Sequence, residues 1–194
     1  NPFMFDTVLI AGLGLMGGSM AKTIKARTLS RVLGWNRTRA TAEQALADGS
    51  IDAIATEALY KEADLVIIGL YPQATVDWLL ENMPKMKKGC VIVDMVGVKQ
   101  FMVDRLEQAA LDAGVHYVGG HPMAGREFSG LDYSLPTLFD GASMIFVPTK
   151  SSTERVLEQL EAYFMSLGFG QTVRCTAEQH DHMIAFTSQL AHVV

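Results

Sequence analysis

The chain has 194 residues, of which 49% are hydrophobic and 19% are charged, with a formal net charge of −5 at pH 7. This length and composition predict a soluble globular protein with a substantial core and exclude an intrinsically disordered chain. The acidic balance, with lysines and arginines scattered apart from a short cluster at residues 85–88, argues against nucleic acid as a partner but leaves small anionic ligands open.

Short β-branched runs alternate with amphipathic stretches along most of the sequence, which predicts βαβ units around a parallel sheet. The runs LVIIGL and VIVDM are apolar on both faces, as is typical of strands covered on each side by helices. The predicted fold is therefore α/β, a Rossmann-type, doubly wound, mainly parallel sheet. The predicted strands are residues 7–11, 31–34, 65–70, 91–94, 115–118, 143–147 and 172–174, and the predicted helices are 15–26, 39–48, 73–82, 100–113 and 153–167.

The first predicted strand runs into the sequence GLGLMGG, which contains Gly12, Gly14 and Gly17 at a strand-to-helix junction. In a dinucleotide site the first glycine allows a tight turn, the second lets the backbone approach a pyrophosphate, and the third lets helix and strand pack closely. The pattern alone is weak, but the flanking strands and helix favour this interpretation over a ligand-free turn. We expect Gly12, Gly14, Leu15, Met16 and Gly17 to bind the cofactor.

The end of the second predicted strand indicates which nucleotide binds, because an acidic residue there holds the ribose of NAD. This chain instead reads GWNRTRA, with the uncharged Asn36 followed by Arg37, Thr38 and Arg39. We expect NAD(P) as cofactor, with NADP favoured, and Asn36, Arg37 and Thr38 among its contacts. The alternative is that both arginines are solvated residues at a helix start. Tyr71 and Pro72, directly after the run 65–70, complete the expected cofactor-binding residues.

Neither cysteine has a partner in the sequence. Cys90 and Cys175 lie in strand-like apolar runs without CxxC spacing or a His/Cys cluster, so we expect buried thiols in a reducing compartment and no metal site. The first residues lack a positively charged leader, and their apolar run is too short to span a bilayer. The sequence therefore predicts a cytoplasmic protein that does not associate with a membrane.

A polar loop, GGHPMAGREFSG at residues 119–130, follows the apolar run 115–120. Its histidine, His121, is predicted at the carboxyl end of a strand, where open α/β sheets bind ligands. A neutral imidazole can accept a hydrogen bond from a substrate hydroxyl near pH 7, and Pro122 stiffens the backbone beside it. The alternative is a loop histidine whose ring is satisfied by a backbone carbonyl.

Two capping boxes are predicted near the end of the chain, Ser151 with Glu154 and Thr176 with Gln179. The helix after Thr176 becomes steadily more apolar and has no glycine, asparagine or proline to end it. We therefore expect residues 1–175 to form a dinucleotide-binding domain. Residues 176–194 are expected to be the first helix of a truncated, all-helical C-terminal domain, or a helix that packs on a partner subunit.

Taken together, GLGLMGGS, GGHPMAGREFSG and AEQHDHMIAFTSQLAHVV resemble the prephenate dehydrogenase family, which includes arogenate dehydrogenases, in the expected order over essentially the whole chain. The resemblance implies oxidative decarboxylation of prephenate to 4-hydroxyphenylpyruvate with NAD(P)+, on the route to tyrosine. It also implies a small-molecule substrate and a homodimer formed through the C-terminal helical region. His121 matches the histidine of the family's HPxAG motif, which hydrogen-bonds the substrate ring hydroxyl. Glu127 and Ser129 match the polar loop near the active-site entrance.

The last helix carries the remaining matches. His180 and Asp181 match the HD pair that opens it in the family, and Ser188 and His192 match an SxLPH segment. The i,i+4 spacing of Ser188 and His192 places both on one helical face. The resemblance thus gives His121, Glu127, Ser188 and His192 as the expected catalytic residues. The alternatives are that His180 and His182 are simply exposed, and that a buried His192 has a structural polar partner.

The sequence departs from the family pattern in two places. Ala191 replaces the proline of SxLPH. In many relatives the loop after the strand ending at Asp94 carries a serine that hydrogen-bonds the catalytic histidine, and Gly97 stands at that position here, whereas Lys99 is retained. A water or backbone group is then expected to orient His121. The arginine that holds the ring carboxylate in relatives comes from a region after the end of this sequence.

Three alternative functions remain. Prephenate and arogenate are not distinguished by these residues. The NRT sequence after the second strand is also similar to that of β-hydroxyacid dehydrogenases, which rely instead on a lysine of a central helix and lack the histidine-proline loop. The third alternative is a module that binds NAD(P) without catalysis, which would not need the polar set of His121, Ser188 and His192.

Overall fold

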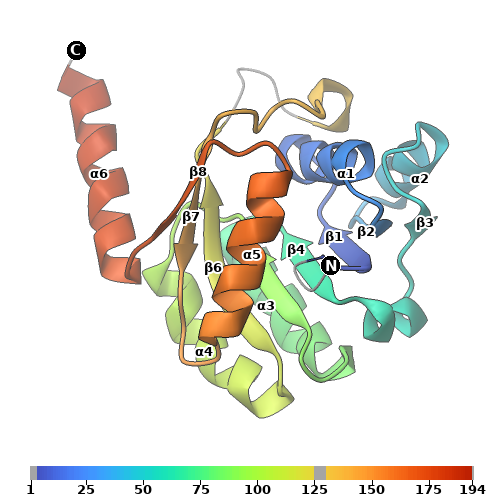
Figure 1. Ribbon diagram of the computed structural model, residues 1–194, viewed down its shortest axis with the longest axis horizontal. Helices are drawn as coiled ribbons and strands as arrows, with labels where there is room; N and C mark the ends of the chain where they lie inside the picture. Colours follow the sequence, from blue (N-terminus) through green and yellow to red (C-terminus); the bar gives the residue numbers. More distant parts are fainter. Residues whose placement is uncertain (1–3, 125–129, 194) are drawn as a thin grey trace.

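The computed structural model describes residues 4–124 and 130–193, with side chains described as far as Thr187. One eight-stranded sheet forms its centre, with helices on both faces (Figure 1). The strands are β1 (Thr7–Ala11), β2 (Arg31–Trp35), β3 (Ala53–Ile54), β4 (Leu65–Ile68), β5 (Val91–Asp94), β6 (His116–Pro122), β7 (Ser143–Val147) and β8 (Gln171–Arg174). The helices are α1 (Leu15–Arg27), α2 (Arg39–Ala47), α3 (Pro72–Asn82), α4 (Gln100–Ala113), α5 (Glu154–Ser166) and α6 (Ala177–Val193), with 3₁₀ turns η1 (Glu57–Glu62), η2 (Met83–Lys85) and η3 (Leu131–Tyr133).

The strand order is β3-β2-β1-β4-β5-β6-β7-β8, and every neighbouring pair is parallel except β6 with β7. The chain builds outward from β1 in one direction through β2 and β3, then returns to the other side of β1 with β4. This reversal leaves a crevice at the carboxyl ends of β1 and β4, where doubly wound sheets bind their ligands. The predicted Rossmann-type, mainly parallel sheet is confirmed.

The core has two layers because alternate strand residues point to opposite faces of the sheet. Val8 and Ile10 pack on one face with residues of α1, α2 and α5. Leu9 and Ala11 pack on the other face with residues of α3 and α4. The strands β4 and β5 are buried at every position, which explains why their sequences are apolar throughout.

The structure extends β6 beyond its predicted end, and it adds the short strand β3 and the 3₁₀ turns. Residues 119–122 pair antiparallel with β7, with His121 opposite Ile145. Glycines weaken the sequence signal for a strand, so the prediction ended at residue 118. At Gly120 the glycine is required, because a Cβ there would lie 2.5 Å from the carbonyl oxygen of Asp94.

One of the two predicted capping boxes is correct. Thr176 and Gln179 exchange side-chain-to-backbone hydrogen bonds of 2.9 and 3.0 Å, as predicted for the start of α6. The box at residues 151 and 154 is wrong. Thr153 caps α5 by accepting a hydrogen bond from the Val156 amide, whereas the Ser151 hydroxyl accepts one from the amide of Tyr117 on β6.

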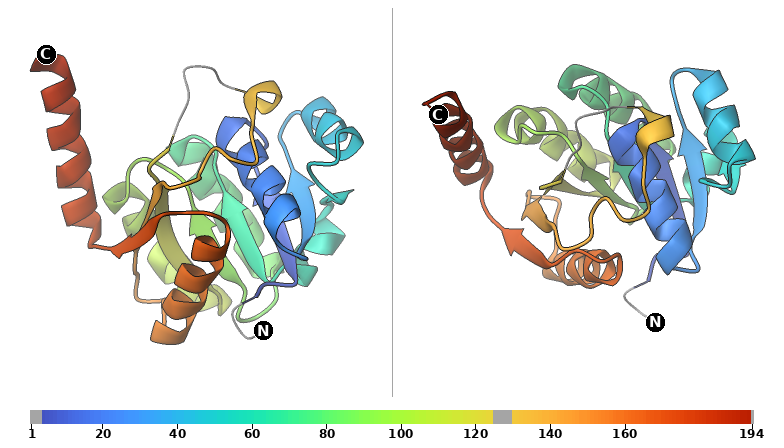
Figure 2. Two further views of the ribbon diagram at one scale, coloured as in Figure 1. Left: turned by 45° about the horizontal axis from the view of Figure 1, so that its top comes forward. Right: turned by 90° about the horizontal axis from the view of Figure 1, so that it is seen from above.

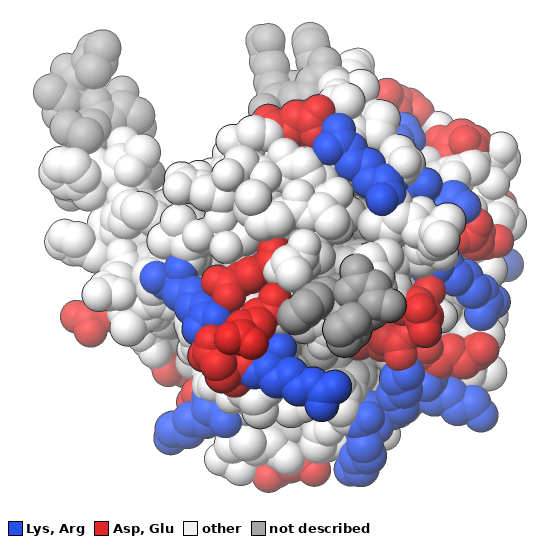
Figure 3. Space-filling view, viewed as in Figure 1, with Lys and Arg blue, Asp and Glu red and all other residues white. Residues whose placement is uncertain are grey.

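The helix α6 leaves the body of the molecule beside the β8 edge and projects away from it (Figures 1 and 2). Met183 and Phe186 on this helix are exposed. On the face seen in Figure 3, basic and acidic side chains are interspersed over the body. Both cysteines are free thiols, but only Cys90 is buried, since Cys175 is half-buried just after β8. Among the described helices, none combines the length and apolar character needed to cross a membrane.

Candidate active site

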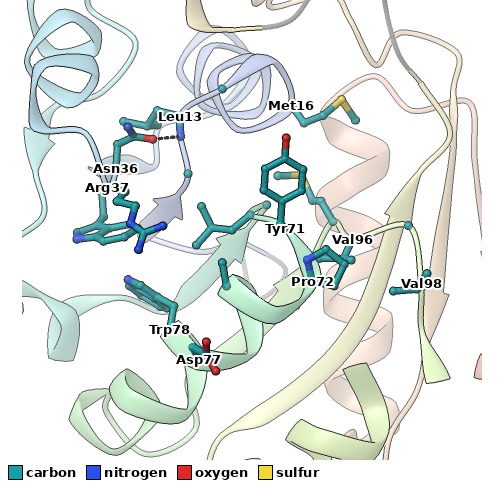
Figure 4. A pocket seen from close by; sticks show the side chains of 18 of the residues that line it. Leu13, Met16, Asn36, Arg37, Tyr71, Pro72, Asp77, Trp78, Val96 and Val98 are labelled. Atoms are coloured by element: carbon teal, nitrogen blue, oxygen red, sulfur yellow. Dashed lines mark hydrogen bonds between the residues drawn. The ribbon is translucent and has the colours of Figure 1, made fainter. Parts of the chain in front are cut away.

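A pocket of about 1030 Å³ occupies the crevice at the carboxyl ends of β1 and β4. Its wall is formed by residues after β1, by the end of β2, by the start of α3 and by residues 95–98 after β5 (Figure 4). This volume is large enough for a small-molecule ligand of dinucleotide size. The topological position and the size of the pocket therefore agree with the dinucleotide site that the sequence predicts.

The glycine turn, residues 12–17, shapes one end of this pocket. Gly12 has a φ of +93°, which favours glycine, and its amide donates to the Trp35 carbonyl over 2.8 Å. A Cβ on Gly17 would lie 1.7 Å from the Gly12 carbonyl oxygen, so α1 packs against the turn only with glycine there. A Cβ on Gly14 would meet no atom within 4 Å. Gly14 thus faces open space at the start of α1, where a pyrophosphate fits.

Asn36 binds the glycine turn directly. Its side-chain oxygen accepts a hydrogen bond from the Leu13 amide over 2.9 Å, drawn in Figure 4, and its side-chain nitrogen donates to the Thr38 carbonyl over 3.0 Å. The exposed Arg37 is part of the pocket wall, but so are the acidic Asp77 and Glu81. Asn36 therefore supports the loop, and the nearby charges have both signs.

Most of the predicted cofactor residues come together in this pocket. Seven of them line it, namely Gly12, Gly14, Met16, Asn36, Arg37, Tyr71 and Pro72, while Leu15, Gly17 and Thr38 do not. Trp35 and Trp78, which were not among the predicted residues, also line the pocket, with their ring centroids 5.6 Å apart. An aromatic residue at the end of the second strand was the available signal.

A second cluster, the histidine junction, consists of Asp94, Lys99, His121, His180 and Asp181. His121 lies on β6 beside residues 95–98. A Cβ on Gly97 would be 3.8 Å from His121 Cε1 and 3.9 Å from its Nε2. Gly97 lines the pocket, whereas His121 is not itself among the lining residues. The Nε2 edge of the imidazole thus adjoins the pocket through a residue that has no side chain.

Asp94 and Lys99 form a fully buried ion pair, with 2.6 Å between Oδ2 and Nζ. Asp94 also accepts hydrogen bonds from the Tyr117 hydroxyl and the Val96 amide, both over 2.9 Å. Lys99 Nζ donates further to the carbonyls of Val96 and Val98. Burial, with the charge of Asp94, raises the pKa of Tyr117, which keeps its hydroxyl a donor. These bonds hold residues 95–98 in place between the pocket and His121.

The environment of His121 favours its neutral form. Burial, followed by the positive charge of Lys99 and the neighbouring His180, lowers its pKa from 6.5 to about 4, although Asp94 acts in the opposite direction. At neutral pH the imidazole therefore has one protonated nitrogen and one nitrogen free to accept a hydrogen bond. This is the form that a hydrogen-bond acceptor for a substrate hydroxyl requires.

The structure shows which group orients the ring of His121. Its Nδ1 lies 2.7 Å from Nε2 of His180, which is fully buried at the first turn of α6. A side chain therefore contacts Nδ1 of His121, on the side of the ring away from Gly97. The alternative that His180 is an exposed side chain was wrong, whereas His182 is exposed. No sequence spacing indicated this contact, because 59 residues separate the two histidines.

The remaining expected catalytic residues are not brought together by the described part of the structure. Glu127 and Ser129 lie outside the described residues. Ser188 and His192 are placed within the backbone of α6, but their side chains are not described. The candidate site therefore rests on the pocket and the histidine junction.

Comparison with known proteins supports one family. The family profile described as "Prephenate dehydrogenase, nucleotide-binding domain" matches residues 20–171. A prephenate dehydrogenase of Bacillus subtilis (strain 168) is 34% identical over 195 residues, which cover 98% of this chain and 52% of that protein. A cyclohexadienyl dehydrogenase of Zymomonas mobilis is 30% identical over 98% of this chain and 65% of that protein. The chain thus spans about half to two thirds of the length of these relatives.

Solved structures agree with the sequence relatives. An arogenate dehydrogenase from Synechocystis superposes with a TM-score of 0.88 at 25% identity, over 95% of this chain and 64% of that one. A prephenate dehydrogenase from A. aeolicus, solved with hydroxyphenyl propionate and NAD+, gives a TM-score of 0.84 at 25% identity, over 97% and 70%. A 3-hydroxyisobutyrate dehydrogenase from Mycobacterium tuberculosis, at 16% identity and a TM-score of 0.76, shares the fold.

Proposed function

The chain belongs to the prephenate dehydrogenase family, and on that premise we propose that it forms the cofactor-binding and catalytic part of an enzyme that oxidatively decarboxylates prephenate to 4-hydroxyphenylpyruvate. The observation that carries the proposal is the position of His121 Nε2 beside Gly97, at the wall of a pocket that fits a dinucleotide. The proposal places the protein in tyrosine biosynthesis, in the cytoplasm.

The cofactor in this proposal is a nicotinamide dinucleotide. Gly14 offers open space at the start of α1 for the pyrophosphate, and Asn36 holds the turn that presents it. The tryptophan pair offers an apolar surface in the same wall. We propose that NADP is accepted as well as NAD, with a preference for NADP, because Asn36 carries no charge and Arg37 can meet a 2′-phosphate.

The chemistry of the bound nicotinamide is to accept a hydride. His121 accepts a hydrogen bond at Nε2 from the hydroxyl on the substrate ring. This bond polarises the hydroxyl while the hydride leaves the ring carbon to which the hydroxyl is attached. Loss of the ring carboxylate as carbon dioxide leaves its electron pair in the ring and yields a phenol. Since aromatisation drives the reaction, the residues of this chain mainly position and polarise the substrate. A well-placed general base contributes roughly 10²–10⁴-fold.

The region after β8 is assigned in the same proposal. We assign residues 176–194 to the start of a helical domain that completes the substrate site and forms a homodimer, with residues 1–175 as the dinucleotide domain. This is supported by the projection of α6 away from the sheet and by the exposed Met183 and Phe186 (Figure 2). We include Glu127, Ser188 and His192 in the proposed substrate site only because the sequence resembles the prephenate dehydrogenase family at these positions.

The test is a spectrophotometric assay of the full-length protein, in which formation of reduced cofactor is followed with NAD+ and NADP+ separately, and with prephenate and arogenate separately. We expect turnover of prephenate and a loss of roughly 10²-fold or more in kcat for His121→Asn. Calorimetric titration of that variant with the cofactor should give the wild-type affinity, because His121 is not in the pocket wall.

Three results would contradict the proposal. Full turnover by His121→Asn would remove the histidine from the chemistry, and turnover of arogenate without prephenate would change the substrate. Cofactor binding without oxidation of either compound would favour the non-catalytic module. A matched control is His182→Asn, an exposed histidine on α6, which should keep wild-type turnover and so exclude a general effect of removing an imidazole.

A further inference from the structure

His180 links the proposed catalytic imidazole to a carboxylate. Its Nε2 lies 2.7 Å from His121 Nδ1, and its Nδ1 lies 2.8 Å from Asp181 Oδ1. The His180 side chain is fully buried, so water does not compete for either nitrogen. Asp181, His180 and His121 thus form a continuous line of hydrogen bonds that ends beside Gly97 in the pocket wall.

Asp181 is fixed by the backbone at the start of α4. Its Oδ1 accepts a hydrogen bond from the Lys99 amide over 2.9 Å, and its Oδ2 accepts one from the Gln100 amide over 3.0 Å. Lys99 is the N-cap residue of α4 but provides no side-chain cap, so Asp181 satisfies amides that would otherwise be free. Burial raises the pKa of Asp181, but hydrogen bonds from His180, Gln100 and Lys99 outweigh it and lower the pKa.

The ionised carboxylate sets the direction of the whole line, because a carboxylate only accepts hydrogen bonds. His180 must therefore donate from Nδ1, and when Nδ1 carries the only ring proton, Nε2 of His180 is an acceptor. His121 must then donate from Nδ1, and its own Nε2 is left without a proton. That nitrogen is the one beside Gly97, where the substrate hydroxyl is proposed to bind.

We propose that His180, held by Asp181, is a positioning residue that fixes both the orientation and the tautomer of His121. The inference rests on the proposed function, in which His121 Nε2 accepts the hydrogen bond of the substrate. His180 contacts the ring at Nδ1, whereas Gly97 adjoins the Nε2 edge of the same ring. Three charged or titratable groups act on the imidazole, namely Lys99 and His180, which disfavour its protonation, and Asp94, which favours it. A neutral, Nδ1-protonated His121 is the consequence.

The direct test is the tautomer of His121 in the protein without substrate or cofactor. The histidine rings are labelled with ¹⁵N, and long-range ¹H–¹⁵N correlation spectra are recorded at pH 7, with a His121→Gln sample to assign the His121 signals. We expect a protonated, pyrrole-type Nδ1 and an unprotonated, pyridine-type Nε2. A proton on Nε2, or on both nitrogens, would overturn the proposal.

Two substitutions at His180 separate support of the tautomer from simple packing. His180→Phe keeps a planar ring but removes the acceptor, so His121 should shift toward the Nε2-protonated tautomer. In His180→Gln the side-chain carbonyl can still accept from His121 Nδ1, so the wild-type tautomer should persist. His182→Phe, on the exposed side of the same helix, should leave the His121 signals unchanged. An unchanged His121 spectrum in His180→Phe would overturn the proposal.

Kinetics of the full-length protein give an independent readout. His180→Phe should lower kcat by about 10- to 100-fold, part of the contribution of a general base, with the KM for the cofactor unchanged and partial rescue in His180→Gln. The two proposals fail differently. An Nε2-protonated His121 in a protein whose His121→Asn variant still loses activity would defeat the role of His180, whereas full activity of His121→Asn would defeat the proposed function whatever tautomer the spectra show.

Discussion

The glycine turn and the histidine junction lie at the same crevice, but they are built in opposite ways. The glycine turn is a contiguous segment of six residues whose shape comes from its own backbone, through the positive φ of Gly12 and the close contact at Gly17. The histidine junction joins side chains from β5, β6, α6 and the start of α4, up to 87 residues apart in the sequence, between Asp94 and Asp181. The glycine turn is therefore formed by local backbone geometry, whereas the histidine junction is formed by tertiary packing.

This difference explains which functional features a sequence can reveal. A turn that needs glycine at fixed offsets leaves a spacing that is visible in any chain of this fold. A contact such as that between His121 and His180 depends on how β6 and α6 are placed, which no spacing records. The following substitutions test whether the two regions differ in their energetics as they do in their construction.

The largest effect is expected when Lys99 is changed to methionine. The substitution leaves the Asp94 carboxylate fully buried without its cation, and removing one partner of a buried pair costs about 3–5 kcal/mol. Denaturant unfolding should measure this loss. Arg39→Met, which breaks the exposed pair with Glu43, is the matched control and should cost less than about 1 kcal/mol. Equal losses for the two would mean that the junction is not a buried electrostatic centre.

The glycine turn is probed by a matched pair of substitutions. Gly17→Ala places a methyl group 1.7 Å from the Gly12 carbonyl oxygen, so unfolding should become easier by about 3 kcal/mol as the helix is displaced. Gly14→Ala meets no atom within 4 Å, so the fold should change by less than about 1 kcal/mol. Its methyl group instead enters the pyrophosphate space, and calorimetry should show cofactor affinity weaker by about tenfold, or about 1.4 kcal/mol. Unchanged affinity would contradict the assigned phosphate position.

The smallest effect is a pH dependence that belongs to the junction alone. The pKa of His121 is near 6.5 when unfolded and about 4 when folded, so the unfolded chain binds more protons between these values. Stability should therefore fall as pH is lowered from about 6.5 to about 4, then level off. The imidazole is partly exposed, so we expect this contribution to be on the order of 1 kcal/mol. Between pH 6.5 and 4, wild type should therefore lose stability relative to His121→Gln, which has no imidazole to protonate, and parallel pH profiles would contradict the shift.

The sequence predicted the sheet well because every central strand is buried on both faces and leaves an unbroken apolar run. It missed β3, which has only two residues, and the end of β6, where glycines obscure the strand. In the site, the glycine turn and Asn36 were predicted from position. The role of Asn36 in holding Leu13, the burial of His180 and the capping of α4 by Asp181 were not, because each depends on a long-range side-chain contact.

The aromatic corner of the pocket has a practical consequence. The chain contains two tryptophans, and both Trp35 and Trp78 line the candidate cofactor site. The intrinsic ultraviolet emission of the protein therefore originates next to that site. Quenching of this emission reports ligand occupancy directly, without any dye, label or engineered residue.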